Sequence, residues 1–178
     1  MEKFTGKVWV LGDDIDTDII IPTEYLALKT IDDMKQYGFS PLRPELAGQI
    51  QKGDIIVAGK NFGCGSSREQ APEIIKALGI QCVIAKSFAR IFFRNSINNG
   101  LLLIEQPDLH EDVKEGDSVT LVGRDGNQEI TMEELAEISG GFHYEIPCLI
   151  GKRVPRRYVK NGKEVGGMMC RDEEYEGF

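Results

Sequence analysis

The fold is decided by residues 54–104, which read DIIVAGKNFGCGSSREQAPEIIKALGIQCVIAKSFARIFFRNSINNGLLLI. Short apolar runs alternate there with longer amphipathic segments, a pattern typical of strands alternating with helices. Gly79 and Gly100 stand where the two helices would end, a position that favours glycine. The alternation predicts an α/β domain with a parallel or mixed sheet and helices packed on it. The predicted strands are 54–60, 81–85 and 101–104, and the predicted helices are 67–78 and 87–98.

Segments on either side of this stretch extend the predicted domain. Residues 7–11, KVWVL, predict a further strand, and a loop rich in aspartate follows it. Downstream, β-type segments at 118–122 and 128–131 flank a glycine-containing turn, which indicates a hairpin. Thr131 and Glu134 have the spacing of a capping box, so a short helix is expected to begin there.

The end of the chain differs from the rest in pattern and in charge. No sustained apolar period follows Pro147, so we expect one domain over residues 1–147 and a separate tail over 148–178. Residues 151–178 hold seven basic and five acidic side chains, whereas the preceding 150 residues carry a net charge of −10. An acidic body disfavours binding to phosphate backbones, and we interpret the basic residues at the end as a solvated terminus.

Composition places the chain among ordinary globular proteins. It has 178 residues, of which 41% are hydrophobic and 28% charged, enough for one domain with a core. Its apolar runs are far shorter than the roughly 20 residues that cross a bilayer. Residues 1–7 alternate charged and apolar side chains and do not form the apolar centre of a signal peptide. We therefore expect a cytoplasmic protein without a membrane partner.

The cysteines do not form a recognisable metal site. Cys64, Cys82, Cys148 and Cys170 are separated by 18, 66 and 22 residues, and the chain has two histidines. Zinc and iron–sulfur ligand sets require closer spacing, so we expect no metal on this chain. Cys82 falls in a predicted strand and is interpreted as core, whereas Cys64 lies between two glycines in a segment suited to chemistry.

That segment, NFGCGSSRE at 61–69, has the features of a small anion site. Its glycines permit positive φ and close approach of a ligand to the backbone. Ser66 and Ser67 would begin the helix, where free N–H groups favour negative charge, and Arg68 can hold a carboxylate in bidentate fashion. The alternative is a plain Gly-Ser turn in which serine caps the helix and Arg68 pairs with Glu69. The spacing fits neither a Walker A loop, a GxSxG elbow nor a GxGxxG fingerprint.

Three blocks of sequence together indicate a family. DIDTDIIIP at 14–22, NFGCGSSRE at 61–69 and AKSFARIF at 85–92 resemble, in this order, the small subunit of 3-isopropylmalate dehydratase, in the aconitase superfamily. The resemblance covers residues 1–147 and implies a three-layer β/β/α aconitase-type swivelling domain with a mixed, mainly parallel sheet. Residues 148–178 depart from the family pattern, so it implies nothing about them.

The resemblance implies a hydro-lyase divided over two chains. The enzyme would isomerise 2-isopropylmalate and 3-isopropylmalate by dehydration and rehydration in leucine biosynthesis. A large subunit would carry a [4Fe–4S] cluster that acts as a Lewis acid on the substrate. This chain would bind no cofactor, supply the base, and be inactive alone; homo-oligomers are compatible with the isolated state.

The resemblance also assigns roles within the motifs. Ser66 matches the catalytic serine, which as an alkoxide would remove a proton from carbon and return it. Ser67 and Arg68 match contacts to the substrate carboxylate. Asp18 matches an aspartate near the active site and is therefore grouped with the substrate-binding residues Ser67 and Arg68. It would either contact the substrate or orient Arg68. The alternative is that Asp18 only caps a turn. Asp14 and Asp16 are expected to cap the loop or face solvent.

The helix predicted at 87–98 receives a structural interpretation. Ser87 is a candidate N-cap, and Arg90 and Arg94 recur on one polar face, which suits a structural or subunit-interface role. Ile91, Phe92 and Ile97 are expected to point towards the core. Cys64 is interpreted as small packing beside the serine and as a candidate for oxidation or alkylation.

Residues 25–28, Tyr25-Leu26-Ala27-Leu28, are expected to form the substrate-specificity loop. Ala27 stands where chains resembling homoaconitase have an arginine, and apolar walls favour an isopropyl group over a further carboxylate. Lys29 lies close enough in sequence to reach a carboxylate, so homoaconitate and a methyl-substituted malate stay open as alternatives. A non-catalytic anion- or RNA-binding module is the alternative from a different class, and the acidic body disfavours it.

Overall fold

The computed structural model describes residues 5–120, 123–139, 156–160, 163–168 and 174–175. The chain divides into two compact units: residues 5–119 form one, and residues 120–178 with 1–4 form the other. The boundary predicted after Pro147 lies outside the described residues. The observed division lies between Val119 and Thr120.

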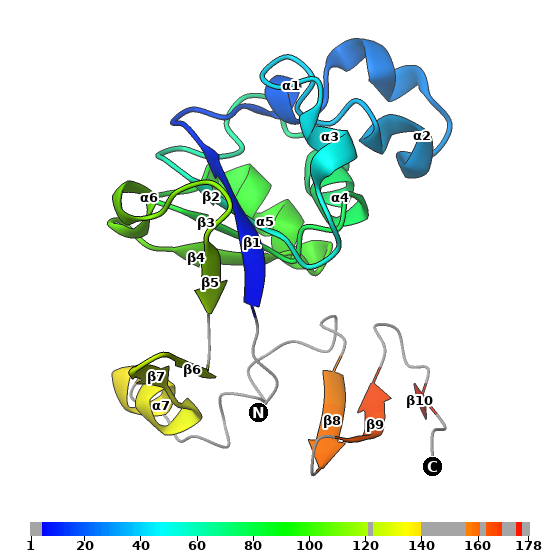
Figure 1. Cartoon of the computed structure of the whole chain (residues 1–178). Coiled ribbons are helices and arrows are strands. Elements are labelled where there is room, and N and C mark those ends of the chain that lie inside the picture. The colour runs from blue at the N-terminus through cyan, green and yellow to red at the C-terminus, as the bar shows by residue number, and fades with distance from the viewer. Residues whose placement is uncertain (1–4, 121–122, 140–155, 161–162, 169–173, 176–178) are drawn as a thin grey trace. The chain divides into compact units, whose positions relative to one another are not determined.

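A five-stranded sheet forms the centre of the first unit, in the order β4-β3-β2-β1-β5 (Figure 1). The pairs β1–β2, β2–β3 and β3–β4 are parallel. Every residue of β2 and β3 is buried, which explains why these strands are continuous apolar runs. The predicted α/β class with a mainly parallel sheet is therefore confirmed. The strands are β1 (Thr5–Leu11), β2 (Ile55–Ala58), β3 (Cys82–Ala85), β4 (Leu102–Glu105) and β5 (Ser118–Thr120).

Two crossover helices connect the parallel strands. Helix α4 (Gln70–Ala77) follows β2 and α5 (Arg90–Asn98) follows β3. Gly79 ends α4 with φ 104°, and a Cβ there would lie 2.9 Å from the Lys52 Cα. Glycine is therefore required by conformation and by space.

Several of the shorter helices gather beyond the end of β1, at the top of Figure 1. Asp16 caps α1 (Thr17–Ile20) by accepting from the Ile19 N–H at 2.8 Å, and Thr30 caps α2 (Ile31–Lys35) in the same way. The Asp16 cap shows why the end of the aspartate-rich loop becomes helical. The remaining short elements are the 3₁₀ helix η1 (Thr23–Ala27), α3 (Leu46–Gln49) and α6 (Leu109–Asp112).

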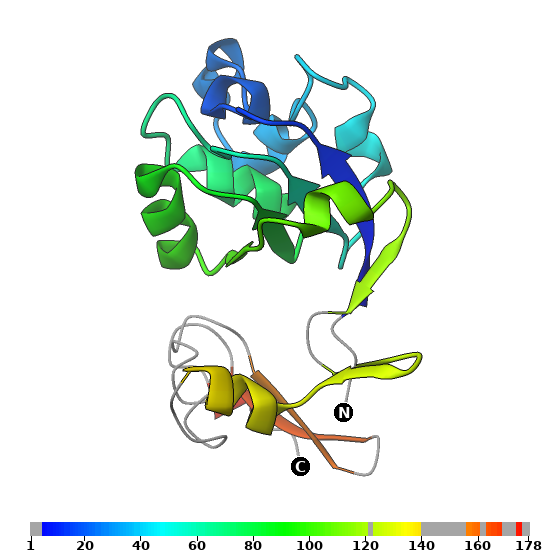
Figure 2. The same ribbon diagram turned by 90° about the vertical axis from the view of Figure 1, so that its left-hand side faces the viewer.

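The second unit contains a hairpin, a helix and a small antiparallel sheet (Figure 2). Strands β6 (Gly123–Asp125) and β7 (Gln128–Ile130) pair antiparallel, so a hairpin is present. Its first strand, however, falls on residues predicted as the turn, and the segment predicted to be that strand joins the five-stranded sheet as β5. The Thr131 hydroxyl accepts from the Glu134 N–H at 3.1 Å, so Thr131 caps α7 (Met132–Ser139) at the predicted position. Strands β8 (Arg156–Lys160), β9 (Lys163–Met168) and β10 (Glu174–Tyr175) form the other sheet. Stacking of a second β layer on the first sheet stays a prediction.

Both crossover helices begin later than predicted. Helix α4 begins at Gln70 rather than at residue 67, and α5 begins at Arg90 rather than at residue 87. The Ser87 hydroxyl does not cap α5, because it accepts a hydrogen bond from the Asn61 N–H at 2.9 Å. The residues preceding each helix are held by neighbouring loops, and this leaves them outside the helix.

Candidate active site

The three sequence blocks meet at one edge of the parallel sheet. The loops at 12–22, 59–69 and 86–89 directly follow β1, β2 and β3. The last residues of these strands, Leu11, Ala58 and Ala85, are register partners, so the loops leave the sheet side by side. The carboxyl edge of a parallel sheet is the usual place for a ligand site in α/β folds.

Backbone hydrogen bonds fix the second loop between the other two. The Gly63 N–H donates to the Ile15 carbonyl at 2.7 Å, and the Thr17 N–H donates to the Cys64 carbonyl at 2.9 Å. On the opposite side, the Phe62 N–H donates to the Ser87 carbonyl at 3.0 Å. Residues 62–64 therefore extend the sheet by a short distance, and the three blocks form one structural unit.

Glycine at position 63 is required by the packing of the third block. Gly63 has φ 77°, and a Cβ at this position would lie 2.1 Å from the Phe92 Cγ. Phe92 is buried and contacts Phe62 edge-on, with ring centroids 5.4 Å apart. The loop can therefore lie close to α5 only without a side chain at position 63.

Ser66 is exposed at the tip of this loop, and its hydroxyl makes no hydrogen bond within the described part of the chain. Its carbonyl accepts from the Thr17 hydroxyl at 3.1 Å and from the Arg68 N–H at 2.8 Å. Among the described residues, the N–H groups of Gly65, Ser66 and Ser67 also have no partner. Three successive free donors can bind an anion.

The source of these donors differs from the prediction. Glu69 is the N-cap of α4 and Gln70 its first residue, so the prediction that Ser66 and Ser67 begin the helix is wrong. The field of a helix terminus falls off within one turn. The donors for an anion at Ser66 are therefore loop N–H groups rather than the helix end.

Arg68 is held by the first block and not by Glu69. Its Nη1 donates to the Ile21 carbonyl at 2.9 Å, and its Nη2 donates to the Thr23 hydroxyl at 2.8 Å. Nη2 also lies 2.7 Å from the Asp18 Oδ1, and the Arg68 side chain is 13% exposed. We call Arg68, Asp18, Thr23 and the Ile21 carbonyl the Arg68 clamp.

Asp18 completes the clamp. Its Oδ1 accepts from the Thr23 hydroxyl at 2.9 Å. This hydrogen bond and the one from Arg68 lower the pKa of the Asp18 carboxyl below its ordinary value. Asp18 is thus a charged partner of Arg68, and the helix-capping role belongs to Asp16.

Other polar residues of the edge hold the loops in place. Asp14 accepts from the Asn61 amide at 2.8 Å, and both residues have positive φ, which asparagine and aspartate tolerate well. Asp13 accepts from the Lys60 N–H at 2.7 Å. The His110 ring bonds to the Leu11 carbonyl at 2.8 Å. These groups serve loop geometry.

The predicted specificity loop lies in η1 and just after it. Tyr25, Leu26 and Leu28 pack against a small core made of Ile21, Met34 and Ile74. Tyr25 also stacks on Tyr37, with ring centroids 3.8 Å apart. Ala27 is exposed, and so is Lys29. Three of the four residues therefore anchor the loop, and Ala27 is the one that faces outward.

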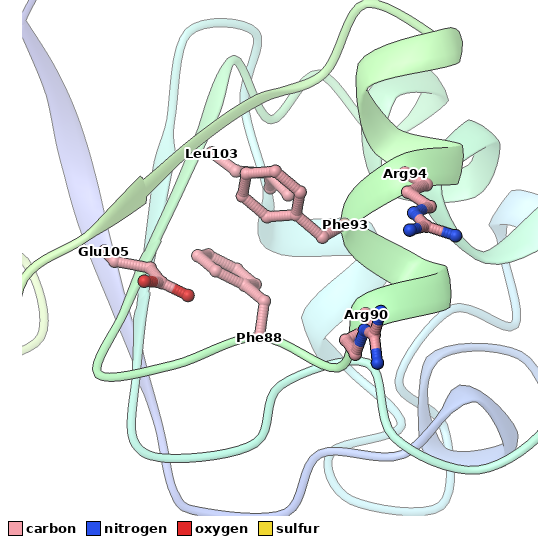
Figure 3. A pocket seen from close by; sticks show the side chains of 6 residues that line it. All are labelled: Phe88, Arg90, Phe93, Arg94, Leu103 and Glu105. Carbon is pink, nitrogen blue, oxygen red and sulfur yellow. The ribbon is translucent and has the colours of Figure 1, made fainter.

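Helix α5 and strand β4 border a separate open pocket of about 510 Å³. Figure 3 shows Phe88, Phe93 and Leu103 between the helix and the strand, and Arg90 and Arg94 of the helix also line the pocket. The prediction that Ile91 and Ile97 face the core is wrong: they are 52% and 54% exposed. The buried positions of α5 are Phe92 and Ser96, one turn apart, so residues beside that line point outward.

The thiols of the first unit are poorly suited to nucleophilic or metal chemistry. Burial, then the charges of Asp16 and Asp14, raises the pKa of the Cys64 thiol, and burial raises the pKa of Cys82 to about 12. Both are protonated at neutral pH. In the described ranges, no three His, Cys, Asp or Glu side chains are placed to hold a metal ion. Nor is any described helix long and apolar enough to cross a membrane.

Comparison with known proteins assigns the family. Residues 20–109 match the family model described as Aconitase C-terminal domain. The 3-isopropylmalate dehydratase small subunit of Lachnospira eligens is 86% identical over 118 residues, which cover 66% of this chain and 72% of that protein. The chain belongs to the 3-isopropylmalate dehydratase small-subunit family. The predicted resemblance is confirmed, and the chain is of the hydro-lyase type.

Other members of the family agree in sequence and in fold. The small subunit of Heliobacterium modesticaldum is 55% identical over 117 residues, covering 66% of this chain and 70% of that protein. The methanogen homoaconitase small subunit of Methanothermobacter thermautotrophicus is 51% identical over 141 residues, which cover 79% of this chain and 77% of that protein. A crystal structure of 3-isopropylmalate dehydratase from Methanocaldococcus jannaschii has a TM-score of 0.62 at 34% identity, covering 84% of this chain and 97% of that one.

A second family model matches the later part of the chain. Residues 79–158 match the model described as Alanine racemase, C-terminal domain. This match covers less than half of the chain and overlaps the first one over residues 79–109. It extends past the division at Val119, into the second unit.

Proposed function

We propose that this chain is the small subunit of a two-chain 3-isopropylmalate dehydratase, which interconverts 2-isopropylmalate and 3-isopropylmalate in leucine biosynthesis. The observation that carries the proposal is the juxtaposition, at one sheet edge, of an exposed serine, three free N–H donors and a clamped arginine. The 86% identity to a small subunit of that name supports it.

In the proposed reaction Ser66 handles the proton. As an alkoxide it takes a proton from the substrate carbon during dehydration, while the C–O bond on the adjacent carbon breaks and the hydroxyl leaves as hydroxide. This hydroxide and the proton that Ser66 then releases together make up the water that is lost. In the reverse direction Ser66 returns the proton to carbon. The free N–H groups of Gly65 and Ser67 lie beside it and favour the charged form. No side chain within the described ranges accepts the Ser66 proton, and we propose that the partner subunit contributes to its removal.

Arg68 and Ser67 would hold the substrate carboxylate. Arg68 is mostly covered and has three protein partners, so its plane is fixed before substrate arrives. A fixed guanidinium binds a carboxylate with little further loss of side-chain entropy. Asp18 would act on the substrate through Arg68, as an orienting residue.

The Lewis acid of the reaction does not fit the cysteines in the described part of this chain. Cys82 is buried in β3, and Cys64 is a single thiol whose pKa is raised, so neither can join a cluster ligand set here. A [4Fe–4S] cluster that polarises the substrate hydroxyl would be held by the large subunit. The base and the Lewis acid would then meet only in the complex.

Ala27 would be the residue that discriminates between the side groups of possible substrates. The exposed methyl group offers no partner to a third carboxylate, which would be costly to bury unpaired. This favours the isopropyl group. The 51% identity to a homoaconitase small subunit keeps homoaconitate as the alternative substrate, and Lys29 is the exposed cation that would serve it.

We also propose that the dehydratase-type domain continues past Val119, as the predicted boundary after Pro147 requires. The match to the methanogen homoaconitase small subunit covers 79% of this chain, and the match to the Methanocaldococcus jannaschii structure covers 84%. Both extend beyond the first unit of residues 5–119.

The test is reconstitution with a cluster-bearing large subunit. Co-purification of the two chains should be followed by an optical assay of the unsaturated intermediate, with 2-isopropylmalate and homoaconitate as parallel substrates. We expect the pair to form and to prefer 2-isopropylmalate. A pair that forms but turns over only homoaconitate would contradict the substrate, and failure of any family large subunit to bind would contradict the subunit role.

A further inference from the structure

Thr23 joins the two parts of the site that the family motifs leave separate. Its hydroxyl accepts from Arg68 Nη2 at 2.8 Å and donates to Asp18 Oδ1 at 2.9 Å. It thereby uses both hydrogen-bonding capacities of a hydroxyl. Thr23 is also the first residue of η1, which leads into the specificity loop.

The clamp leaves Arg68 able to bind a ligand. A guanidinium has five N–H donors, and the Ile21 carbonyl, the Thr23 hydroxyl and the Asp18 carboxylate take three of them. The Nε–H and one Nη1–H stay available, and each can donate to an oxygen of a ligand. This chain therefore orients Arg68 and still leaves it with N–H donors for a ligand.

The other end of the connection is rigid as well. Two residues after Thr23, Tyr25 stacks on Tyr37 with an interplanar angle of 2°. Leu26 and Leu28 pack against the core of Ile21, Met34 and Ile74. A displacement of Thr23 would therefore strain either the loop or the guanidinium, because both are anchored.

We propose that Thr23 is a positioning residue that couples Arg68 to the specificity loop at 25–28, so that carboxylate recognition and side-group recognition are set as one unit before substrate binds. The consequence for the substrate rests on the proposed function. The coupling itself is a property of the isolated chain. This role goes beyond the three sequence blocks, because Thr23 lies outside all of them.

The kinetic test uses two variants and a matched control in the reconstituted pair. Thr23→Val keeps the shape of the side chain and removes both hydrogen bonds, so the KM for 2-isopropylmalate should rise about 3- to 10-fold with kcat within twofold. Thr23→Ser keeps the hydroxyl and should restore the wild-type KM. Thr30→Val changes a similarly exposed threonine at the start of α2, outside the clamp, and should leave the KM unchanged.

A second readout does not depend on turnover. NMR titration of the Asp18 carboxyl in the isolated chain should show a pKa that rises towards the ordinary value in Thr23→Val but not in Thr23→Ser or Thr30→Val. An active wild-type pair whose KM is unaffected by Thr23→Val would overturn the coupling, as would an unchanged Asp18 pKa. An inactive wild-type pair would count against the proposed function, and the titration would still decide whether the clamp operates.

Discussion

Ser66 and Arg68 are two residues apart, yet their surroundings are opposite. The Ser66 side chain is exposed and makes no hydrogen bond in the described part of the chain. The Arg68 side chain is 13% exposed and has three partners, all from the loop that follows β1. Under the proposed function, this chain alone holds the carboxylate-binding part of the site in place, whereas the proton-transfer part at Ser66 has no side-chain partner among the described residues. A subunit that works only in a complex would be built in this way.

The largest expected effect is that of replacing Ser66, the proposed base, on kcat. Ser66→Ala should lower kcat of the reconstituted pair by several orders of magnitude with little change in KM, since the hydroxyl acts mainly in the transition state. Because Ser66 is exposed and lies outside α4, the melting temperature should not change. Steady-state kinetics and thermal unfolding measure both. Ser40→Ala, in a turn outside the site, is the control, and a nearly active Ser66→Ala pair would remove Ser66 from the base role.

The rigid support shared by both parts of the site can be tested at Gly63. Gly63→Ala combines a left-handed φ with a clash against Phe92, so it should destabilise the fold by at least about 2 kcal/mol. For a chain of this length, that lowers the melting temperature by about 4–8 °C. Gly12→Ala, where a Cβ meets nothing within 4 Å, should cost less than about 0.5 kcal/mol. Equal melting temperatures for the two variants would refute the packing argument.

Substitution of Arg68, in the proposed carboxylate-binding part of the site, should mainly change KM. Arg68→Lys keeps the charge but loses the planar fork, so KM should rise about 10- to 100-fold, which corresponds to about 1.5–3 kcal/mol for a charged hydrogen bond. Some loss of kcat is expected as well, because Arg68 lies beside the Ser66 loop. Kinetics of the pair measure the split. A variant with wild-type KM would show that the clamped arginine does not bind substrate.

The pH dependence of the clamp gives a smaller effect with a defined sign. Because the pKa of Asp18 is lowered in the folded chain, its contribution to stability is complete above the unfolded pKa of about 3.9. That contribution is lost as the pH falls through the folded value. Urea unfolding at pH 7 and near pH 3 should show a smaller acid-induced loss for Asp18→Asn than for wild type. Equal losses would indicate that the pair is screened by solvent.

The smallest expected effect concerns the thiol beside the site. A raised pKa keeps Cys64 protonated at neutral pH, so iodoacetamide should modify it more slowly than a free cysteine peptide, and faster as the pH rises. Peptide mapping by mass spectrometry separates it from the other cysteines. Rapid modification at pH 7 would show an activated thiol and would restore the role in inactivation that the sequence suggested.

Local sequence patterns predicted the elements that depend on neighbours in the chain. The continuous apolar runs of β2 and β3 and the terminal Gly79 are local signals, and all three were predicted correctly. The start of α4 was not, because Ser66 and Arg68 are tied to Thr17 and Ile21, about 50 residues earlier. A serine before a helix has the same local pattern whether it caps that helix or not.

Residues placed by tertiary contacts were the hardest to predict within the site. Thr23 belongs to no motif and lies 45 residues from Arg68, so no spacing rule indicates its role. Ile91 and Ile97 have the apolar character of core residues but lie beside the buried line of α5. The family resemblance did indicate Asp18 as a residue that could orient Arg68, and the structure places Asp18 Oδ1 2.7 Å from Arg68 Nη2.

The most direct measurement of the central claim is a titration of a fixed amount of cluster-bearing large subunit with this chain, following dehydration of 2-isopropylmalate. The account predicts no activity from this chain alone, a rise with each addition and a plateau when the large subunit is saturated. Ser66→Ala should compete for the large subunit and lower the plateau. Dehydration by the isolated, metal-free chain would contradict the account, because it would mean that the reaction requires nothing from a large subunit.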